Sequence, residues 1–481
     1  MIERLTPLDA AFLDAEDEDR HASMAIASVA VFEGPPPSHE ELVADVRGKL
    51  PLVPRYRQKL RTVPFDLGQP VWVDDPGFDI RYHVRRTALP APGDDEALCR
   101  LVARLMSQRL DRERPLWECW VVEGLRDGRW AMVSKVHHCM ADGIAGTNIY
   151  NTLFDASPEP RAPVEDGWAP AAEPSTLRLT AGALRDLALS PVAQLGMLSR
   201  ALGSPRQVAR RVAATSRGLV TLARALTPAT ASSLNGPIGH HRRYAIGRAS
   251  MADVVGVGKN LQASMNDVML AAISGAFRNL LLERGEHPDA HTVRSLVPVA
   301  VRTRSSGTVN GAVCGNRISL MLAFLPIHIA DPVERLAAVH AHLGELKASR
   351  EAEAGAAMTT LAEREPFPPI SWGIRLASHL PQRSIVTVTT NVPGPRQPLY
   401  VLGRRMLEIL PYVPIAVRLR TGVAILSYCG QVAFGVTSDY GSTPEAAALA
   451  RAIEDGISEL VKAAGLRRTP PRKEAVTGAR R

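Results

Sequence analysis

The chain has 481 residues, of which 46% are hydrophobic and 22% charged. This is the composition of a folded globular protein that is long enough for two or three domains. The net charge of +8 suits a nucleic acid, an anionic membrane or an anionic substrate as partner. Aromatic residues make up only 5%, so the basic segments lack the stacking side chains that single-stranded nucleic acids require. We therefore expect no nucleic-acid partner.

Compartment and bound groups are also constrained by the sequence. No segment approaches the roughly 18 consecutive apolar residues of a membrane-spanning helix, and the first residues lack the layout of a signal peptide, so we expect a cytoplasmic protein. The five cysteines are scattered and form no C-x-x-C pair, which indicates reduced thiols. His240 and His241 have no spaced third ligand, and no dinucleotide or P-loop motif is complete. We predict no metal site and no permanently bound cofactor.

The first 160 residues alternate between strand-like and helix-like segments. Apolar runs at 25–32 and 130–136 predict strands, and residues 98–110 have the periodicity of a helix. After residue 154 the chain becomes rich in proline, which neither a helix nor a strand can continue. We therefore predict a first domain of residues 1–160.

Residues 161–233 are predicted to be a linker that contains a basic amphipathic helix. From Leu187 to Ala252 there is no aspartate or glutamate. At about 100° per residue, one stripe of this segment is apolar and the opposite stripe is basic. The basic stripe consists of Arg206, Arg210, Arg217 and Arg224. This pattern predicts either docking on an anionic lipid surface or a core-packing helix with a solvated basic face.

The second half, residues 234–466, repeats the mixed pattern, and a loose basic tail follows at 467–481. We predict a strong helix at 266–282, a strand at 293–301 and a hairpin within 422–437. The two mixed halves are of similar size. The sequence therefore predicts an α/β protein built from two comparable parts.

The start of the last helix is predicted from local chemistry. Ser442 and Glu445 have the spacing of a capping box, in which each side chain bonds to the backbone N–H of the other residue. Pro444 suits the first turn of a helix. We therefore expect the last helix to begin here.

The predicted strand at 130–136 runs directly into His137-His138-Cys139-Met140-Ala141-Asp142-Gly143, and a helix-like segment follows. A strand end that leads through a tight turn into a helix is a good place to display a side chain. Adjacent strand residues point to opposite faces, so His137 and His138 cannot both line one cavity. One is expected to be buried support and the other functional. The plain alternative is an ordinary strand-end histidine that is satisfied by backbone groups.

The H-H-x-x-x-D-G run resembles the signature of the CoA-dependent acyltransferase superfamily, which includes chloramphenicol acetyltransferase and the condensation domains of peptide synthetases. Other blocks are similar to those of the bacterial wax ester synthase/diacylglycerol acyltransferases, in the same order along nearly the whole chain. These blocks are residues 7–13, 115–117, 234–239, 266–268, 297–302, 315–316 and 391–395. Residues 16–21 and Thr390 depart from the family pattern, which leaves the preferred acceptor open.

The resemblance implies two similar mixed-sheet domains of the chloramphenicol acetyltransferase-like fold, with a central channel. Acyl-CoA is expected to enter it on one side and the alcohol on the other. His138 begins the H-x-x-x-D spacing and is the expected general base, with His137 and Gly143 in support. Asp142 is expected to face away from the substrate and to pair with an arginine, for which Arg302 is the candidate.

Asn266 and Asp267 open the predicted helix of the second half. In the family this pair is needed for activity and lies near the channel. The plain alternative is that Asn266 is the N-cap of the helix, a position that asparagine favours.

The chemistry explains why a histidine is needed. Transfer from a thioester to an alcohol removes a proton from a weakly acidic hydroxyl, and an imidazole that titrates near 6.5 suits that task. The chain has no G-x-S-x-G elbow, and the CoA thiolate is a good leaving group, so we expect no covalent acyl-enzyme.

We therefore predict acyl-CoA as co-substrate and diacylglycerol or a long-chain alcohol as acceptor. The expected place of action is the surface of the inner membrane or of lipid droplets. Two alternatives remain: a condensation-type enzyme that acylates another alcohol or an amine, and a non-catalytic protein of the same fold that binds lipid surfaces.

Overall fold

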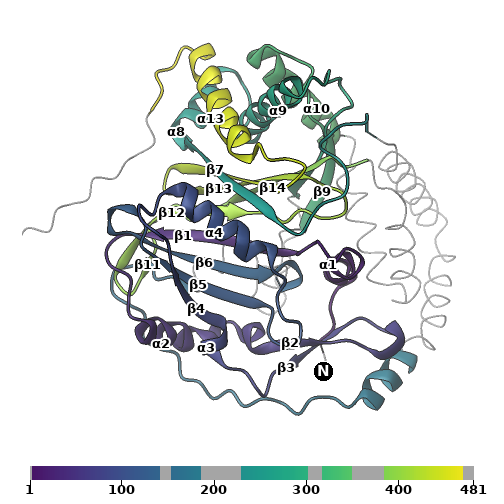
Figure 1. Ribbon diagram of the computed structural model, residues 1–481, viewed down its shortest axis with the longest axis vertical. Coiled ribbons are helices and arrows are strands. Elements are labelled where there is room, and N and C mark those ends of the chain that lie inside the picture. The colour runs from purple at the N-terminus through teal and green to yellow at the C-terminus, as the bar shows by residue number, and fades with distance from the viewer. Residues whose placement is uncertain (1–2, 141–152, 186–228, 302–316, 349–383, 470–481) are drawn as a thin grey trace, which may run out of the picture.

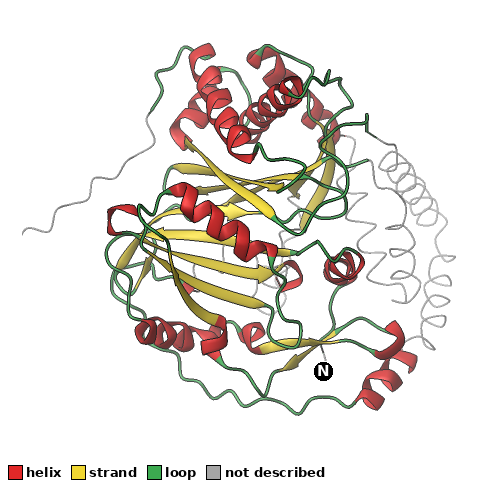
Figure 2. Ribbon diagram, viewed as in Figure 1, coloured by secondary structure: helices red, strands yellow, loops and turns green. Residues whose placement is uncertain are grey.

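The computed structural model describes residues 3–140, 153–185, 229–301, 317–348 and 384–469. They form two lobes, each built on a six-stranded mixed sheet with helices packed against it (Figure 1, Figure 2). Each lobe has its own large hydrophobic core. The predicted α/β architecture of two mixed-sheet halves is confirmed. None of the described helices is long and apolar enough to cross a bilayer.

The sheet of the first lobe has the strand order β11-β12-β1-β6-β5-β4. These strands are β11 (Tyr400–Val401), β12 (Arg404–Tyr412), β1 (Ala25–Phe32), β6 (Trp130–His137), β5 (Trp117–Glu123) and β4 (Val84–Ala88). Neighbouring strands are antiparallel except β4 and β5. The central position of β1 and β6 explains why both read as nearly continuous apolar runs in the sequence.

Four named helices, a helical segment at 176–185 and a small hairpin complete the described part of the first lobe. The helices are α1 (Pro7–Glu18), α2 (His39–Lys49), α3 (Ile80–His83) and α4 (Asp95–Ser107), and the hairpin pairs β2 (Gln58–Arg61) with β3 (Val71–Asp74). Helix α4 lies across the sheet on the side of the second lobe (Figure 1). Its buried residues Leu98, Val102 and Leu105 recur at helical spacing and face the core of the first lobe.

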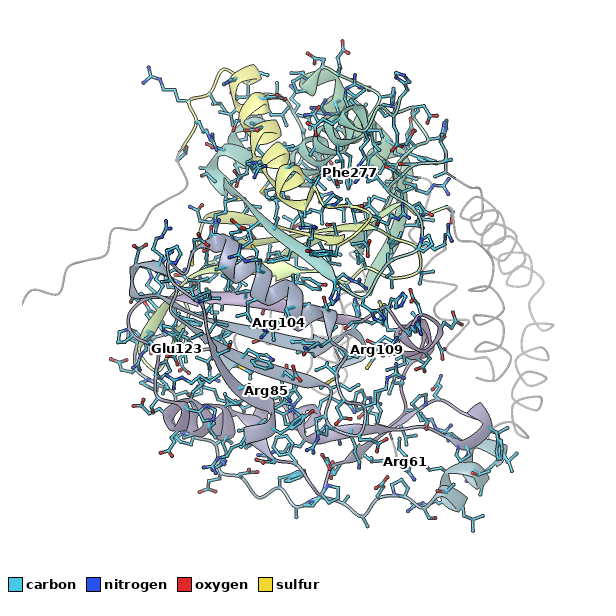
Figure 3. The ribbon with its side chains drawn as sticks, in the orientation of Figure 1. Arg61, Arg85, Arg104, Arg109, Glu123 and Phe277 are labelled. Atoms are coloured by element: carbon cyan, nitrogen blue, oxygen red, sulfur yellow. The ribbon has the colours of Figure 1, made fainter. Side chains whose placement is uncertain are left out.

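The sheet of the second lobe has the strand order β7-β14-β13-β10-β8-β9. These strands are β7 (Arg242–Ser250), β14 (Gln431–Asp439), β13 (Thr421–Tyr428), β10 (Thr387–Pro393), β8 (Arg294–Val301) and β9 (Arg317–Phe324). Its helices are α8 (Met251–Asn260), α9 (Met265–Glu283), α10 (Pro332–Ala348) and α13 (Ala446–Ala463), and they cover one face of this sheet (Figure 1). Phe277 of α9 is fully buried in this layer (Figure 3).

The division of the chain into 1–160 and 234–466 needs a correction. Strands β11 and β12 come from the second half of the chain but belong to the sheet of the first lobe. Strand β12 pairs antiparallel with β1 over six residue pairs, from Ala27 opposite Tyr412 to Phe32 opposite Met406. Without β12, the edge of β1 would present unpaired backbone groups, and this explains why the chain crosses over.

The central residues of the predicted elements agree with the structure, and the ends differ. The strand at 25–32 is β1, and the helix predicted at 266–282 is α9, which ends just before Gly285 at a φ of 74°. The helix predicted at 98–110 begins and ends three residues earlier. The segment after Asp142, like the basic stripe of the predicted linker, lies outside the described residues.

The predicted capping box of the last helix is wrong. Helix α13 begins after Glu445, and its N-cap position has no side-chain hydrogen bond. The Ser442 hydroxyl donates to the carboxylate of Asp439 at 2.7 Å, and Glu445 accepts two hydrogen bonds from the guanidinium of Arg284. The carboxylate of Asp439, three residues earlier, and the guanidinium of Arg284, at the end of α9, outweigh the cap, because hydrogen bonds to charged groups are stronger than neutral ones.

Gly435 lies at a close contact between the two sheets. A Cβ atom at this position of β14 would lie 1.7 Å from the carbonyl oxygen of Pro411 on β12. The same oxygen accepts a hydrogen bond from the Tyr244 hydroxyl at 2.8 Å. The lobes are therefore joined by a contact that only glycine permits.

We predict that Gly435→Ala lowers the free energy of unfolding by about 1–3 kcal/mol or more, because an overpacked site must shift its backbone. Gly344→Ala is the control: nothing lies within 4 Å of the added Cβ on α10, and alanine is the better helix former by about 1 kcal/mol. Denaturant unfolding of both variants checks the prediction. Equal stability of the two variants would contradict it.

Candidate active site

The two adjacent histidines lie where β6 ends. His137 is the last residue of the strand, and His138 begins the single 3-10 turn η5 (His138–Met140). Both main-chain amides are held: His137 donates to the carbonyl of Leu116, and His138 donates to the carbonyl of Met24, each at 2.9 Å. The His137 side chain is 1% exposed, whereas that of His138 is half-buried.

Helix α1 packs directly against this turn. It begins after Thr6, whose hydroxyl accepts a hydrogen bond from the amide of Asp9 at 3.2 Å. The ring of Phe12 stacks on the imidazole of His138, with 3.9 Å between the ring centroids and 28° between the planes. One face of the His138 imidazole is therefore covered by an apolar ring.

The hydrogen bonds around His137 determine its tautomer. Its Nδ1 accepts a hydrogen bond from the amide of Cys139 at 3.2 Å, so the ring proton is on Nε2. Nε2 lies 3.5 Å from the Oε1 atom of Glu16. His137 therefore connects the backbone of the turn to a buried carboxylate.

Glu16 is the charged group at the centre of this arrangement. Its Oε1 accepts a hydrogen bond from the amide of Met24 at 2.6 Å, and its Oε2 accepts one from Nη2 of Arg112 at 3.0 Å. Burial by itself would raise the pKa of Glu16, but His137, the Met24 amide and Arg112 lower it from 4.5 to about 2. The side chain is an anion at neutral pH although it is 1% exposed.

Two further basic side chains fix the surroundings of the histidines. Lys135 is on the same face of β6 as His137, and its Nζ donates to the carbonyls of Leu105 and Gln108 at the end of α4. Burial lowers the pKa of Lys135 to about 8. Arg109 donates to the carbonyls of Ala22 and Asp19 and of Glu16, and so holds the chain that follows α1 (Figure 3).

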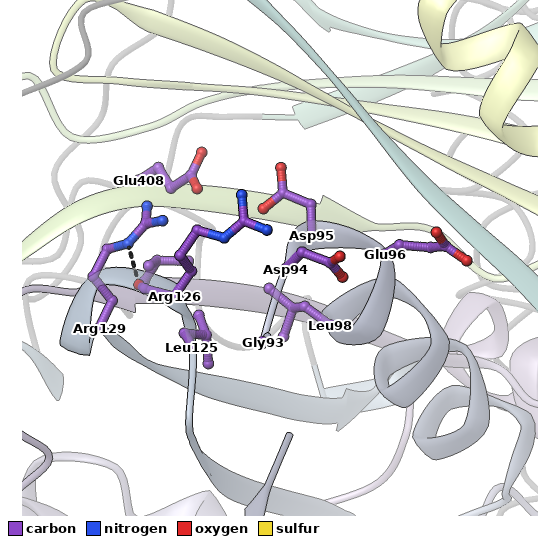
Figure 4. Close-up of a pocket in the computed structure, with 10 residues that line it drawn as sticks. Gly93, Asp94, Asp95, Glu96, Leu98, Leu125, Arg126, Arg129 and Glu408 are labelled. Atoms are coloured by element: carbon purple, nitrogen blue, oxygen red, sulfur yellow. Dashed lines mark hydrogen bonds between the residues drawn. The ribbon is translucent and has the colours of Figure 1, made fainter. Parts of the chain in front are cut away.

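A polar cavity of about 360 Å³ lies at the opposite end of β6 (Figure 4). Among its lining residues are Asp95, Glu96, Arg126, Arg129 and Glu408, so both acids and arginines line it. Arg129 directly precedes β6, whereas His137 ends it, so the length of the strand separates this cavity from the histidines. A cavity with so many charges does not suit an acyl chain.

Comparison with known proteins places these residues in a family. A model of the wax ester synthase/diacylglycerol acyltransferase catalytic domain matches residues 5–269, and a model of the WS/DGAT C-terminal domain matches residues 314–461. A probable diacylglycerol O-acyltransferase of Mycobacterium tuberculosis, tgs1, is 43% identical over 98% of this chain and 99% of its own. The chain belongs to the wax ester synthase/diacylglycerol acyltransferase family.

Solved structures agree with this membership. The wax ester synthase/diacylglycerol acyltransferase from Marinobacter aquaeolei VT8 matches with a TM-score of 0.65 and 26% identity over 96% of this chain and 100% of its own. The first condensation domain of the calcium-dependent antibiotic synthetase matches with a TM-score of 0.58 and 15% identity over 96% of both chains. The second likeness concerns the fold alone.

The block at 115–117 of this family member holds the main chain of His137. The indole Nε1 of Trp117 donates to the carbonyl of Tyr56 at 2.8 Å, and its ring stacks on His83, with centroids 4.5 Å apart. Leu116, the preceding residue, supplies the carbonyl that holds the amide of His137. A rigid tryptophan thus fixes a backbone acceptor of the site.

The block at 234–239 ties the lobes together beside α1. The Ile238 carbonyl lies 3.0 Å from the Nδ1 atom of His21, and Arg242 donates to the carbonyl of His21 at 2.5 Å. The amide of Gly239 donates to the carboxylate of Asp439 at 2.6 Å. The loop that leads from α1 to β1 is therefore anchored on the second lobe.

Asn266 and Asp267 lie in the second lobe, at the start of α9. The N-cap is Ser264, so the alternative in which Asn266 caps the helix is wrong. Asp267 is buried and completes the capping box with Ser264, and its Oδ2 lies 2.8 Å from Nδ1 of His340. The Asn266 side chain instead accepts a hydrogen bond from Asn391 at 3.1 Å, which joins two family blocks.

Three residues of the predicted site cannot be placed. Asp142, Gly143 and Arg302 lie outside the described residues, so the pairing of Asp142 with Arg302 stays a prediction. Sequence reasoning overlooked Glu16, although one signal was present. Glu16 follows Phe12 by four residues, and residues at this spacing share one face of a helix.

The pKa of Glu16 predicts a dependence of stability on pH. Because this pKa falls from 4.5 in the unfolded chain to about 2 in the folded protein, its contribution is complete above pH 4.5 and is lost as the pH falls toward 2. We expect the extra stability of wild type over Glu16→Gln to shrink over this range by on the order of 3 kcal/mol. Urea unfolding at several pH values measures it. Glu18→Gln is the control: Glu18 is exposed, and the variant should differ little from wild type in stability at each pH. A difference in stability between wild type and Glu16→Gln that does not change with pH would contradict the prediction.

Proposed function

We propose that this family member transfers a long-chain acyl group from acyl-CoA to the hydroxyl of diacylglycerol, and also to that of a fatty alcohol, with His138 as general base. The observation that carries the proposal is the fixed, half-buried imidazole of His138 at the end of β6, stacked on Phe12. The names of relatives, among them diacylglycerol O-acyltransferases and a wax ester synthase, support the acceptors.

The proposed reaction has two steps and needs no resident cofactor. In the first step, neutral His138 takes the proton of the acceptor hydroxyl while its oxygen attacks the thioester carbonyl, which gives a tetrahedral oxyanion. In the second step, the oxyanion collapses, the C–S bond breaks and the CoA thiolate leaves. The imidazolium then returns the proton to the thiolate, so that ester and free CoA are the products.

Cys139 is the obvious candidate for a covalent acyl carrier, and its surroundings argue against that role. The thiol is buried, and burial together with the charges of Asp9 and Glu16 raises its pKa well above the ordinary value. A thiol is nucleophilic as the thiolate, and this environment disfavours the thiolate. We therefore propose direct transfer within a ternary complex of enzyme, acyl-CoA and acceptor.

The test compares three adjacent residues. We predict that His138→Ala lowers the rate of acyl transfer by ~10²–10⁴-fold and stays folded, because loss of a general base costs that much. His137→Ala should keep measurable activity or lose it together with thermal stability, since its imidazole is buried support. Release of CoA thiol and formation of triacylglycerol, with a long-chain acyl-CoA and diacylglycerol, measure the rates.

Cys139→Ala is the matched control and should retain transfer, because the main-chain amide that holds His137 remains. A folded His138→Ala protein with near wild-type rate would overturn the assignment of the base. An acyl group trapped on Cys139 would replace direct transfer by a two-step route. Transfer to amines but not to alcohols would favour a condensation-type reaction, and no thiol release at all would favour a lipid-binding protein.

We also propose that the protein acts at an anionic lipid surface, peripherally on the inner membrane or on lipid droplets. The support is an apolar face in the first lobe that is formed by Phe65, Leu177 and Leu184, whose exposed fractions are 86%, 80% and 49%. Leu177 and Leu184 are seven residues apart in the helical segment 176–185, on one stripe. Gly68, close to Phe65 in the chain, lies against Ala183 of this segment.

The charges beside this apolar face suit anionic lipid. Arg178 and Arg185 are exposed and each directly follows one of the two leucines. The opposite side of the segment is anchored, because Leu179 is buried with Val71 and Val73 of the small hairpin. Apolar side chains bordered by arginine are the pattern of a helix that lies in a membrane interface.

We predict that Phe65→Ser combined with Leu177→Ser weakens binding to vesicles that contain anionic lipid, by roughly tenfold, because burial of two large side chains is lost. Co-sedimentation measures the binding. Leu282→Ser removes an exposed leucine of the second lobe, 43% exposed, and should bind like wild type. Binding that is unchanged in the double variant and insensitive to salt would refute this surface.

A further inference from the structure

Helix α1 presents two side chains to the histidine pair. Phe12 stacks on His138, and Glu16, one helical turn later, lies beside His137. Both come from the same face of the helix, because residues four apart are neighbours on its surface. A single helix therefore determines the surroundings of both histidines.

The carboxylate of Glu16 reaches the backbone of His138 through Met24. Its Oε1 holds the amide of Met24 at 2.6 Å, and the carbonyl of Met24 accepts the amide of His138 at 2.9 Å. Met24 directly precedes β1, so this is the point at which the pairing of β1 with β6 stops. A shift of Met24 would displace the main chain of His138.

The same carboxylate reaches the turn a second way, through His137. Glu16 lies 3.5 Å from Nε2 of His137, and Nδ1 of that ring accepts the amide of Cys139, the residue after His138. The anion favours the tautomer with the proton on Nε2, and this tautomer leaves Nδ1 free to accept. His138 is thus held by its own amide and by that of the next residue.

We infer that Glu16 is a positioning residue of the reaction, which fixes the backbone on both sides of His138 and places a buried negative charge near the base. The inference rests on the proposed role of His138 as general base. Glu16 touches neither substrate nor reacting atoms; it acts through Met24 and His137.

The charge of Glu16 predicts a change in the pH dependence of kcat/KM when this residue is replaced. A nearby anion stabilises the protonated form of an imidazole, and a nearby cation destabilises it. Ionisable groups surround the histidine pair from α1, from β6 and the strands β5 and β4 beside it, and from the chain after α4. Among the described residues they are Asp9, Glu16, Lys135, Glu118, Arg85, Arg109 and Arg112. Only Glu16 bonds to Arg112 and also lies against a histidine ring.

The test is the pH profile of kcat/KM for three variants. Glu16→Gln should lower kcat at least tenfold with KM for acyl-CoA within threefold, because a carboxamide has one acceptor oxygen for the three donors of Met24, His137 and Arg112. The acidic limb of its profile, which reports protonation of the base, should move down by about one pH unit. Arg112→Gln should move the same limb up.

Asp17→Asn is the matched control. Asp17 is exposed and accepts a hydrogen bond from the same arginine at 2.7 Å, but unlike Glu16 it does not lie against His137, so kcat should stay within twofold of wild type. Thermal melting of each variant separates misfolding from misplacement. If Glu16→Gln is unfolded, the test of the inference is whether the acidic limb of Arg112→Gln moves up.

Three outcomes would overturn the inference if Glu16→Gln folds: an unchanged kcat, a loss of kcat without a shift of the acidic limb, or a shift of the limb in the same direction as in Arg112→Gln. If Glu16→Gln does not fold, an unmoved acidic limb in Arg112→Gln would overturn it. His138→Ala in the same assay separates this failure from failure of the proposed function. An active His138→Ala enzyme refutes the base itself, whereas an inactive one beside an unaltered Glu16→Gln enzyme refutes only the role of Glu16.

Discussion

Strand β6 ends inside the protein, and the backbone groups at its end must be paired there. Buried N–H groups without partners cost free energy comparable to a lost hydrogen bond. The carbonyls of Leu116 and Met24 meet this requirement for the two histidines. Trp117 supports the first carbonyl, and Glu16 fixes the residue that supplies the second. The site is thus a consequence of where one strand stops and of what pairs with its last amides.

Three of the family blocks in the described part of the chain support the same turn. Residues 7–13 cover His138, residues 115–117 hold His137, and residues 234–239 anchor the loop between α1 and β1 on the second lobe. These segments are far apart in sequence but converge on one turn. The acyltransferase therefore needs both lobes assembled before His138 is held in place.

Sequence periodicity predicted the elements whose apolar side chains are sufficient to place them in the core. Strands β1 and β6 and helix α9 are apolar enough that burial alone dictates them. The capping box at Ser442 failed because other charged groups bind its two residues more strongly: Asp439, three residues earlier, binds Ser442, and Arg284, which is distant in sequence, binds Glu445. Glu16 was overlooked for the same reason: a carboxylate in an acidic run reads as solvated, and only the fold brings Arg112 and His137 to it. Local patterns do not reveal long-range partners.

Strand β12 has a further consequence for how the chain reaches this state. The sheet of the first lobe is finished only when residues 404–412 pair with β1, long after residues 25–32 have been synthesised. During translation the edge of β1 that later binds β12 is therefore unpaired. This edge adjoins Met24, whose carbonyl binds the amide of His138. An exposed strand edge invites pairing with other chains. The nascent protein is thus open to misassociation at the strand that later supports the turn of His138, and the pairing of β12 ends that period.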